Sequence, residues 1–111
     1  MSQKKLDQKI KKLAKQYVKR LRESKYPVVK AFVFGSRVRG NARNDSDVDV
    51  AIISPRVTDP VFSNAHLLRK AHEYGLQKID LYIEPHGFNP DDFVDENPLV
   101  WEIKQTGVPV G

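Results

Sequence analysis

Apolar residues near the start of the chain recur at steps of three and four, and the positions between them are nearly all Lys, Arg or Gln. This spacing places the apolar side chains on one face of an α-helix. Five residues carry the pattern: Leu6, Ile10, Leu13, Tyr17 and Leu21. It predicts a long basic amphipathic helix over residues 1–25, with Pro27 just past its end.

Three later segments have the pattern of β-strands. Residues 28–34 are mostly β-branched or aromatic and end at Gly35, which is typical of a buried strand. Residues 47–53 alternate carboxylate and aliphatic side chains until a Ser-Pro pair interrupts them. Residues 78–84 alternate in the same way, and we expect a third strand there.

Helical patterns lie between and after these strands. Residues 36–40 suit a tight turn or one helical turn, and residues 59–74 predict a helix that ends at Gly75. Residues 97–106 predict a last helix, with Gly107 as its stop signal. The order of elements predicts a small α/β or α+β domain, in which helices lie on one side of a mixed sheet of about three strands.

Composition and length narrow the class of protein. A chain of 111 residues, 40% hydrophobic and 30% charged, is expected to form one domain over residues 1–111. The absence of cysteine excludes disulfides, thiolate chemistry and cysteine-based zinc sites. No apolar run approaches the roughly 20 residues of a membrane span, and the charged N-terminus does not resemble a secretory signal. We therefore expect a cytoplasmic protein without a membrane partner.

The net charge of +5 raises the question of nucleic-acid binding. Ten Lys or Arg residues lie between Lys4 and Lys25, against only Asp7 and Glu23. Because the basicity belongs mainly to this segment, a solvated helix face is favoured over a nucleic-acid surface.

Asp47 and Asp49 are candidates for metal binding. Side chains two positions apart on a strand point to the same face, so the two carboxylates project together. They repel one another unless a cation lies between them or one is protonated. Hard oxygen ligands suit Mg²⁺ or Mn²⁺. If the third strand is a neighbour, Asp80 can join them, and three carboxylates can hold two ions about 3.5–4 Å apart.

The Gly35–Ser36 pair is a candidate for phosphate binding. Gly35 ends a strand and Ser36 opens a turn, so backbone N–H groups there can point at an anion. Glycine permits close approach, the serine hydroxyl adds a donor, and Arg37 and Arg39 suit phosphate oxygens. A Walker A sequence is absent, which argues against a P-loop ATPase.

The other polar residues are assigned structural roles. The histidines are scattered without acidic or cysteine companions at ligand spacing: His66, His72 and His86. We expect surface or core positions for them in preference to catalytic ones.

Gly35-Ser36, ten residues and then Asp47-Val48-Asp49 resemble the GS-x10-D-x-D signature of the DNA polymerase beta-like nucleotidyltransferase superfamily. The fuller run around the two motifs resembles the minimal nucleotidyltransferases, or MNT proteins, from about Val28 to Ile83, with Val38 where alanine is usual. The resemblance implies the polymerase beta-like fold, with a catalytic core over residues 28–84.

The resemblance also implies an activity and a role for each residue. Asp47 and Asp49 would ligate two metal ions, Mg²⁺ or Mn²⁺, and Asp80 would be the third carboxylate. Gly35 and Ser36 would grip the triphosphate of ATP. An acceptor hydroxyl would attack the α-phosphorus, take up AMP and release pyrophosphate.

The acceptor is left open by the sequence, as is the base of the nucleotide. Larger relatives carry a further domain that binds the acceptor, and this chain has no length to spare for one, so a partner is expected. Resemblance to MNT proteins implies a helical HEPN toxin as that partner, with this chain as its antitoxin. The alternatives are a steric antitoxin without catalysis, or a nucleotidyltransferase acting on a small molecule or nucleic acid.

Overall fold

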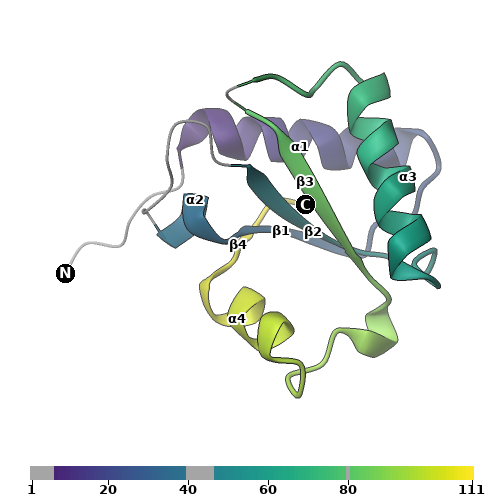
Figure 1. The fold of residues 1–111 in the computed structure, drawn as a ribbon, viewed down its shortest axis with the longest axis vertical. Helices are drawn as coiled ribbons and strands as arrows, with labels where there is room; N and C mark the ends of the chain where they lie inside the picture. The colour runs from purple at the N-terminus through teal and green to yellow at the C-terminus, as the bar shows by residue number, and fades with distance from the viewer. Residues whose placement is uncertain (1–6, 40–46, 80) are drawn as a thin grey trace.

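The computed structural model describes residues 7–39, 47–79 and 81–111. Within them, helices and strands alternate along the chain (Figure 1). The elements are α1 (Gln8–Glu23), β1 (Lys30–Phe34), α2 (Ser36–Arg39), β2 (Val48–Ile53), α3 (Pro60–Glu73), β3 (Ile83–Phe88), the 3-10 helix η1 (Pro90–Asp92), α4 (Pro98–Thr106) and β4 (Val108–Pro109).

The strands of this described part form one four-stranded mixed sheet in the order β3-β2-β1-β4. Strand β1 is antiparallel to both β2 and β4, whereas β2 and β3 are parallel. Helix α3 provides the crossover that a parallel pair requires. In this register Asp49 of β2 lies opposite Phe34 of β1 on one side and Glu84 of β3 on the other.

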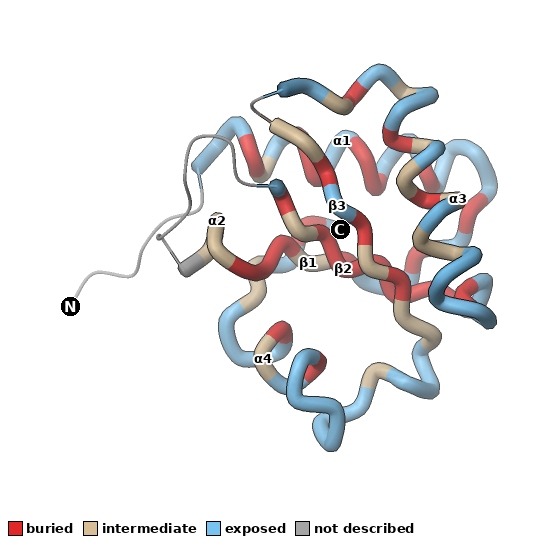
Figure 2. The backbone as a smooth tube through the Cα atoms, viewed as in Figure 1, coloured by how far each residue is buried: buried red, intermediate tan, exposed pale blue. Residues whose placement is uncertain are grey.

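Helices cover both faces of the sheet. On one face, α1 and α3 pack against Val50, Ile52 and their neighbours, and the Tyr17 hydroxyl joins the two helices by donating to the Leu67 carbonyl at 2.8 Å. On the other face, Ile103 of α4 packs with residues of β1 and β2. Figure 2 shows the buried residues concentrated in the sheet and on the inner sides of the helices. The expectation of helices on one side only was wrong, because a sheet with two apolar faces must cover both.

Helix ends follow local sequence signals. The Asp7 carboxylate accepts from the Lys9 N–H at 2.8 Å and caps α1. Asp59 and Asn97 cap α3 and α4 in the same way, and each is followed by a proline. The apolar stripe of α1 is buried as expected from Ile10 onward, and residues 1–6 of the predicted helix lie outside the described residues.

The third strand begins five residues later than the sequence pattern predicted. The Gln77 side chain accepts from the Ile83 N–H at 2.6 Å and donates to the Ile83 carbonyl at 2.8 Å. The backbones of Lys78 and Leu81 also bond to each other. Most of the alternation predicted over residues 78–84 therefore lies before β3. The fourth strand was not predicted, because two residues are too few for a pattern.

None of the helices in the described ranges combines the length and apolar character needed to cross a bilayer.

Candidate active site

Asp47 and Asp49 lie at the start of the central strand β2. Val48, Val50 and Ile52 alternate with them and are fully buried against the helices α1 and α3. The two aspartates therefore point to the opposite side, as the period of two predicts. Asp47 is exposed, whereas the Asp49 side chain retains 24% of its exposure.

Glu84 of β3 lies directly across from Asp49. The parallel register pairs the two residues, so both carboxylates project from the same face of the sheet. Burial raises the pKa of Glu84; His86 opposes this shift, while the negative charges of Asp49 and Asp47 add to it. Asp49 and Glu84 therefore form a carboxylate pair across the two strands, and Asp47 lies near enough to raise the pKa of Glu84.

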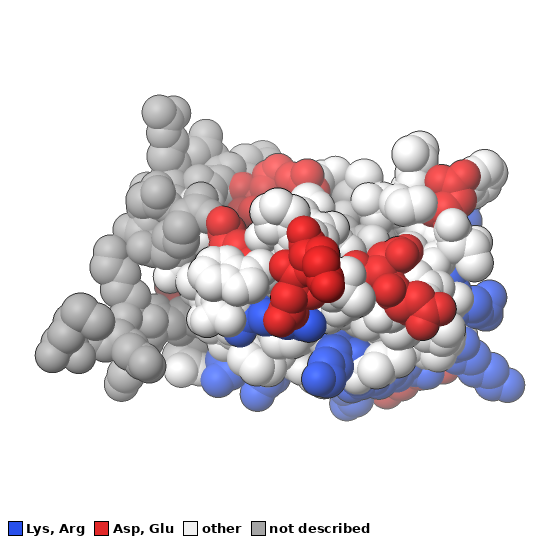
Figure 3. Space-filling model, turned by 90° about the horizontal axis from the view of Figure 1, so that it is seen from below, with Lys and Arg blue, Asp and Glu red and all other residues white. Residues whose placement is uncertain are grey.

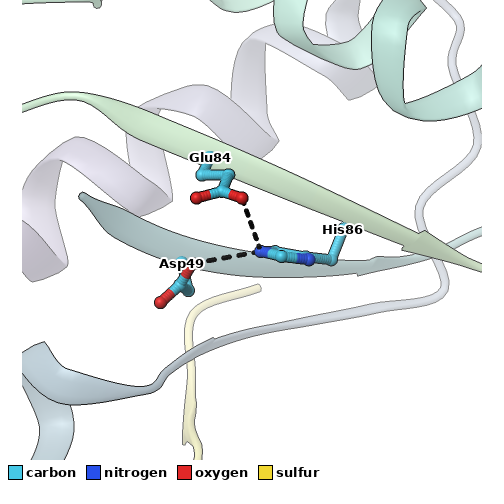
Figure 4. A group of neighbouring side chains, drawn as sticks. All are labelled: Asp49, Glu84 and His86. Atoms are coloured by element: carbon cyan, nitrogen blue, oxygen red, sulfur yellow. Dashed lines mark hydrogen bonds and ion pairs between the residues drawn. The ribbon is translucent and has the colours of Figure 1, made fainter.

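His86 reaches into this cluster from two positions further along β3. Its Nε2 lies 3.0 Å from Oδ1 of Asp49 and 3.8 Å from Oε2 of Glu84. Figure 4 shows the imidazole extending between the two carboxylates. Because an ionised carboxylate can only accept, the Nε2–H donates to Asp49. The edge-to-face contact with Phe34, at 5.1 Å between ring centres, holds the ring from the β1 side.

The Gly35–Ser36 turn lies beside the Asp49 carboxylate, next to strand β1. Gly35 has a φ of +84°, and a Cβ atom there would lie 2.5 Å from Oδ2 of Asp49. Glycine is needed both for the backbone conformation and for the space. Ser36 then begins the short helix α2, and the Val38 N–H bonds to the Gly35 carbonyl at 3.1 Å.

The sequence-predicted residues are only partly gathered in the described part of the chain. Asp49 lies beside Gly35. Asp47 is two residues before Asp49 in the chain, and Ser36 and Arg37 follow Gly35 in α2. Asp80 and the side chain of Arg39 lie outside the described residues. Sequence reasoning missed Glu84 and His86 as site residues, because the misplaced third strand hid their spacing of two, the same spacing that identified the aspartates.

The donor set of this cluster fits a divalent cation. Asp49, Glu84 and His86 each offer one ligand atom, and these atoms lie within 4.8 Å of one another. Three carboxylates raise each other's free energy when ionised, and a cation between them removes that penalty. Asp47, Asp49 and Glu84 supply the hard oxygen atoms that Mg²⁺ and Mn²⁺ take.

A groove of about 580 Å³ begins at His86 and runs between α3 and α4. Its lining combines apolar side chains such as Leu99 with the amide of Asn64 and the carboxylates of Asp91 and Asp92. Figure 3 shows acidic side chains gathered on the face that carries α4. The groove therefore presents an acidic and partly apolar surface beside the carboxylate cluster.

A comparison with known families shows the family to which the chain belongs. The chain matches the model of the family described as "Nucleotidyltransferase domain" over residues 5–105, and it belongs to that family. No curated protein matches the chain.

Two solved structures share the fold. A candidate nucleotidyltransferase from Sulfolobus solfataricus is 17% identical, with a TM-score of 0.58, over 91% of this chain and 78% of that one. A chain from a toxin-antitoxin structure with AMP-PNP is 16% identical, with a TM-score of 0.56, over 87% of this chain and 72% of that one.

Proposed function

We propose that this chain transfers AMP from ATP to a hydroxyl group on a protein partner. The observation that carries the proposal is the convergence of Asp47, Asp49 and Glu84 beside the Gly35–Ser36 turn. Membership of the nucleotidyltransferase family supports the reaction type. The nucleotide and the acceptor are our inference.

Three carboxylates would hold the divalent cations: Asp47, Asp49 and Glu84. Two ions, Mg²⁺ or Mn²⁺, would neutralise triphosphate charge and make an attacking hydroxyl easier to deprotonate. Asp80 was expected as the third carboxylate from the sequence. Glu84 takes this role in our proposal, because its pairing with Asp49 places it in the cluster.

The Gly35–Ser36 turn would bind the triphosphate. The missing side chain at Gly35 leaves the backbone open next to Asp49, and the Ser36 N–H and hydroxyl are donors at the start of α2. Arg37 and Arg39 would add charge to this side. The chain's contribution to catalysis is then to hold the phosphates and the acceptor in line and to exclude other geometries.

The acceptor would occupy the groove that begins at His86. The carboxylates of the groove attract positively charged groups of a partner and repel a triphosphate. We therefore assign the groove to the acceptor and not to the nucleotide. Similarity to a chain of a toxin-antitoxin structure supports a protein acceptor. We propose a helical HEPN toxin as that partner, in a cytoplasmic pair with this chain as antitoxin.

Label transfer tests the proposal. The chain is incubated with ATP labelled on the α-phosphate and Mg²⁺ or Mn²⁺, with and without the toxin. We expect label on the toxin, whereas ATP labelled on the γ-phosphate should release labelled pyrophosphate only. An Asp47→Ala, Asp49→Ala variant should lose transfer by at least about a hundredfold.

Other results would contradict parts of the proposal. Label on added RNA or on an aminoglycoside, and none on the toxin, would show that the acceptor is not a protein. Neutralisation of the toxin by the double variant, without any label, would favour a steric antitoxin.

A further inference from the structure

The carboxylate cluster contains a nitrogen atom that can bind a cation, and the three candidate ligand atoms of Asp49, Glu84 and His86 lie within 4.8 Å of one another. The Nε2 of His86 lies 3.0 Å from Asp49 and 3.8 Å from Glu84, so it faces both carboxylates at once. Two ligands at right angles, each about 2.1 Å from an ion, are about 3.0 Å apart. The distance between His86 Nε2 and Asp49 Oδ1 equals this spacing between neighbouring ligand atoms.

Three contacts hold the imidazole at that point without an ion. Parallel pairing of β2 with β3 places His86 one alternation step beyond Glu84, on the same face. Phe34 supports the ring from β1, and Asp49 accepts its N–H. His86 retains 27% of its side-chain exposure, so the ring is confined. Glu84, which is 51% exposed, has the freedom to close the remaining distance.

We propose that His86 is a direct nitrogen ligand of the bound cation, which gives the centre a preference for Mn²⁺ over Mg²⁺. An ion takes the place of the Nε2 proton, and the neutral imidazole then carries its proton on Nδ1. Mg²⁺ takes oxygen ligands and gives up its waters reluctantly. Imidazole suits transition-metal ions such as Fe²⁺ and Zn²⁺, and of the two ions expected at this centre Mn²⁺ is the transition-metal ion. This inference rests on the metal centre of the proposed function and adds the identity of the ion.

Electron spin echo measurements on bound Mn²⁺ test the ligation directly. Mn²⁺ is titrated into the full chain, and modulation of the echo by ¹⁴N reports a nitrogen bonded to the ion. We expect this modulation in the wild type, and its replacement by the ¹⁵N pattern when the histidines carry ¹⁵N. Mn²⁺ and Mg²⁺ affinities are measured on the same samples.

Two variants separate ligation from a hydrogen-bonding role. In His86→Gln the amide N–H can still donate to Asp49, but it cannot replace the imidazole nitrogen as a ligand. We expect this variant to lose the ¹⁴N modulation and to bind Mn²⁺ about ten- to a hundredfold more weakly, with a smaller loss for Mg²⁺. His72 lies on α3 and bonds to Tyr82. In His72→Gln, both properties should remain.

Mn²⁺ bound without nitrogen modulation would overturn the inference, as would a His86→Gln variant with unchanged Mn²⁺ affinity. Label transfer from ATP is measured in parallel with Mg²⁺. If label is transferred but no nitrogen is bound to Mn²⁺, the inference about His86 is wrong and the proposed function still stands. Failure of Mn²⁺ to bind at all would overturn the inference together with the proposed metal centre.

Discussion

A methyl group on Gly35 would lie 2.5 Å from the Oδ2 atom of Asp49. The turn that begins the predicted phosphate site thus lies in contact distance of a predicted metal ligand. Gly35 belongs to the turn after β1 and Asp49 to the neighbouring strand β2, and antiparallel pairing of Phe34 with Asp49 brings them together.

Gly35→Ala should destabilise the fold and displace Asp49. The backbone at Gly35 has a φ of +84°, which costs a residue with a side chain about 1–2 kcal/mol, and the contact with Asp49 adds to this. Gly75→Ala is the matched control, because Gly75 has a φ of +71° and nothing within 4 Å of an added Cβ.

Urea unfolding of both variants and Mn²⁺ titration check this prediction. Both should be destabilised, Gly35→Ala more strongly, and only Gly35→Ala should weaken metal binding. Equal destabilisation with intact metal binding in both would show that the contact with Asp49 has no consequence.

Glu84→Gln should stabilise the metal-free protein at neutral pH. Burial and the nearby aspartates raise the pKa of Glu84 above its ordinary value, so its ionisation favours the unfolded chain. The wild type should therefore gain stability as the pH falls through this raised pKa, and Glu84→Gln should lack that gain.

Thermal unfolding in chelator across pH 4–8 measures this difference, with the exposed Glu96→Gln as a control. Added Mn²⁺ should raise the Tm of the wild type, and the shift should be smaller in Glu84→Gln. A Glu84→Gln variant that is less stable than the wild type at pH 7 without metal would contradict the clustering of carboxylates.

Tyr17→Phe should weaken the packing of α1 on α3 without affecting the site. Its hydroxyl donates to the Leu67 carbonyl in a fully buried position, and its loss removes one buried hydrogen bond, at about 0.5–1.5 kcal/mol. Tyr74→Phe removes an exposed bond to Ser24 and should cost less. Denaturant midpoints and Mn²⁺ affinity measure both effects; a smaller loss in Tyr17→Phe than in Tyr74→Phe would disprove this account.

Leu99→Arg should block the proposed acceptor groove. Leu99 lines the groove on α4, whereas Trp101 on the same helix is exposed outside the groove lining. Leu99→Arg should reduce transfer to the partner and leave Mn²⁺ affinity unchanged, and Trp101→Arg should transfer normally. The two variants are compared by label transfer at several partner concentrations, and equal activity would place the acceptor elsewhere.

Sequence periodicity predicted the parts of the fold that depend on a single element. The stripe of α1 and the alternation of β2 each follow from one element that buries one side, so Tyr17 and Val50 could be assigned to the core directly. The Gly35–Ser36 and Asp47–Asp49 motifs could be found for the same reason, since each is local.

Glu84 and His86 could not be assigned, because their roles depend on pairing between distant strands. Local alternation fits residues 78–84 as well as it fits β3. The start of the strand is decided by the bonds from Gln77 to Ile83 and by the register of β3 on β2. Only that register shows that Glu84 faces Asp49.

Strand β3 lies at the edge of the sheet and pairs, within the described residues, with β2 alone. Because Asp49 belongs to β2 and Glu84 and His86 belong to β3, a cation bound by all three would cross-link the edge strand to its neighbour. Without the cation, the carboxylates of Asp49 and Glu84 repel one another across that pairing, and the hydrogen bond from His86 to Asp49 is a side-chain contact that remains between these residues. Local opening of β3 would then depend on the supply of metal. When metal is scarce, the edge strand would open more readily and expose its backbone to hydrogen exchange, to proteases and to other chains.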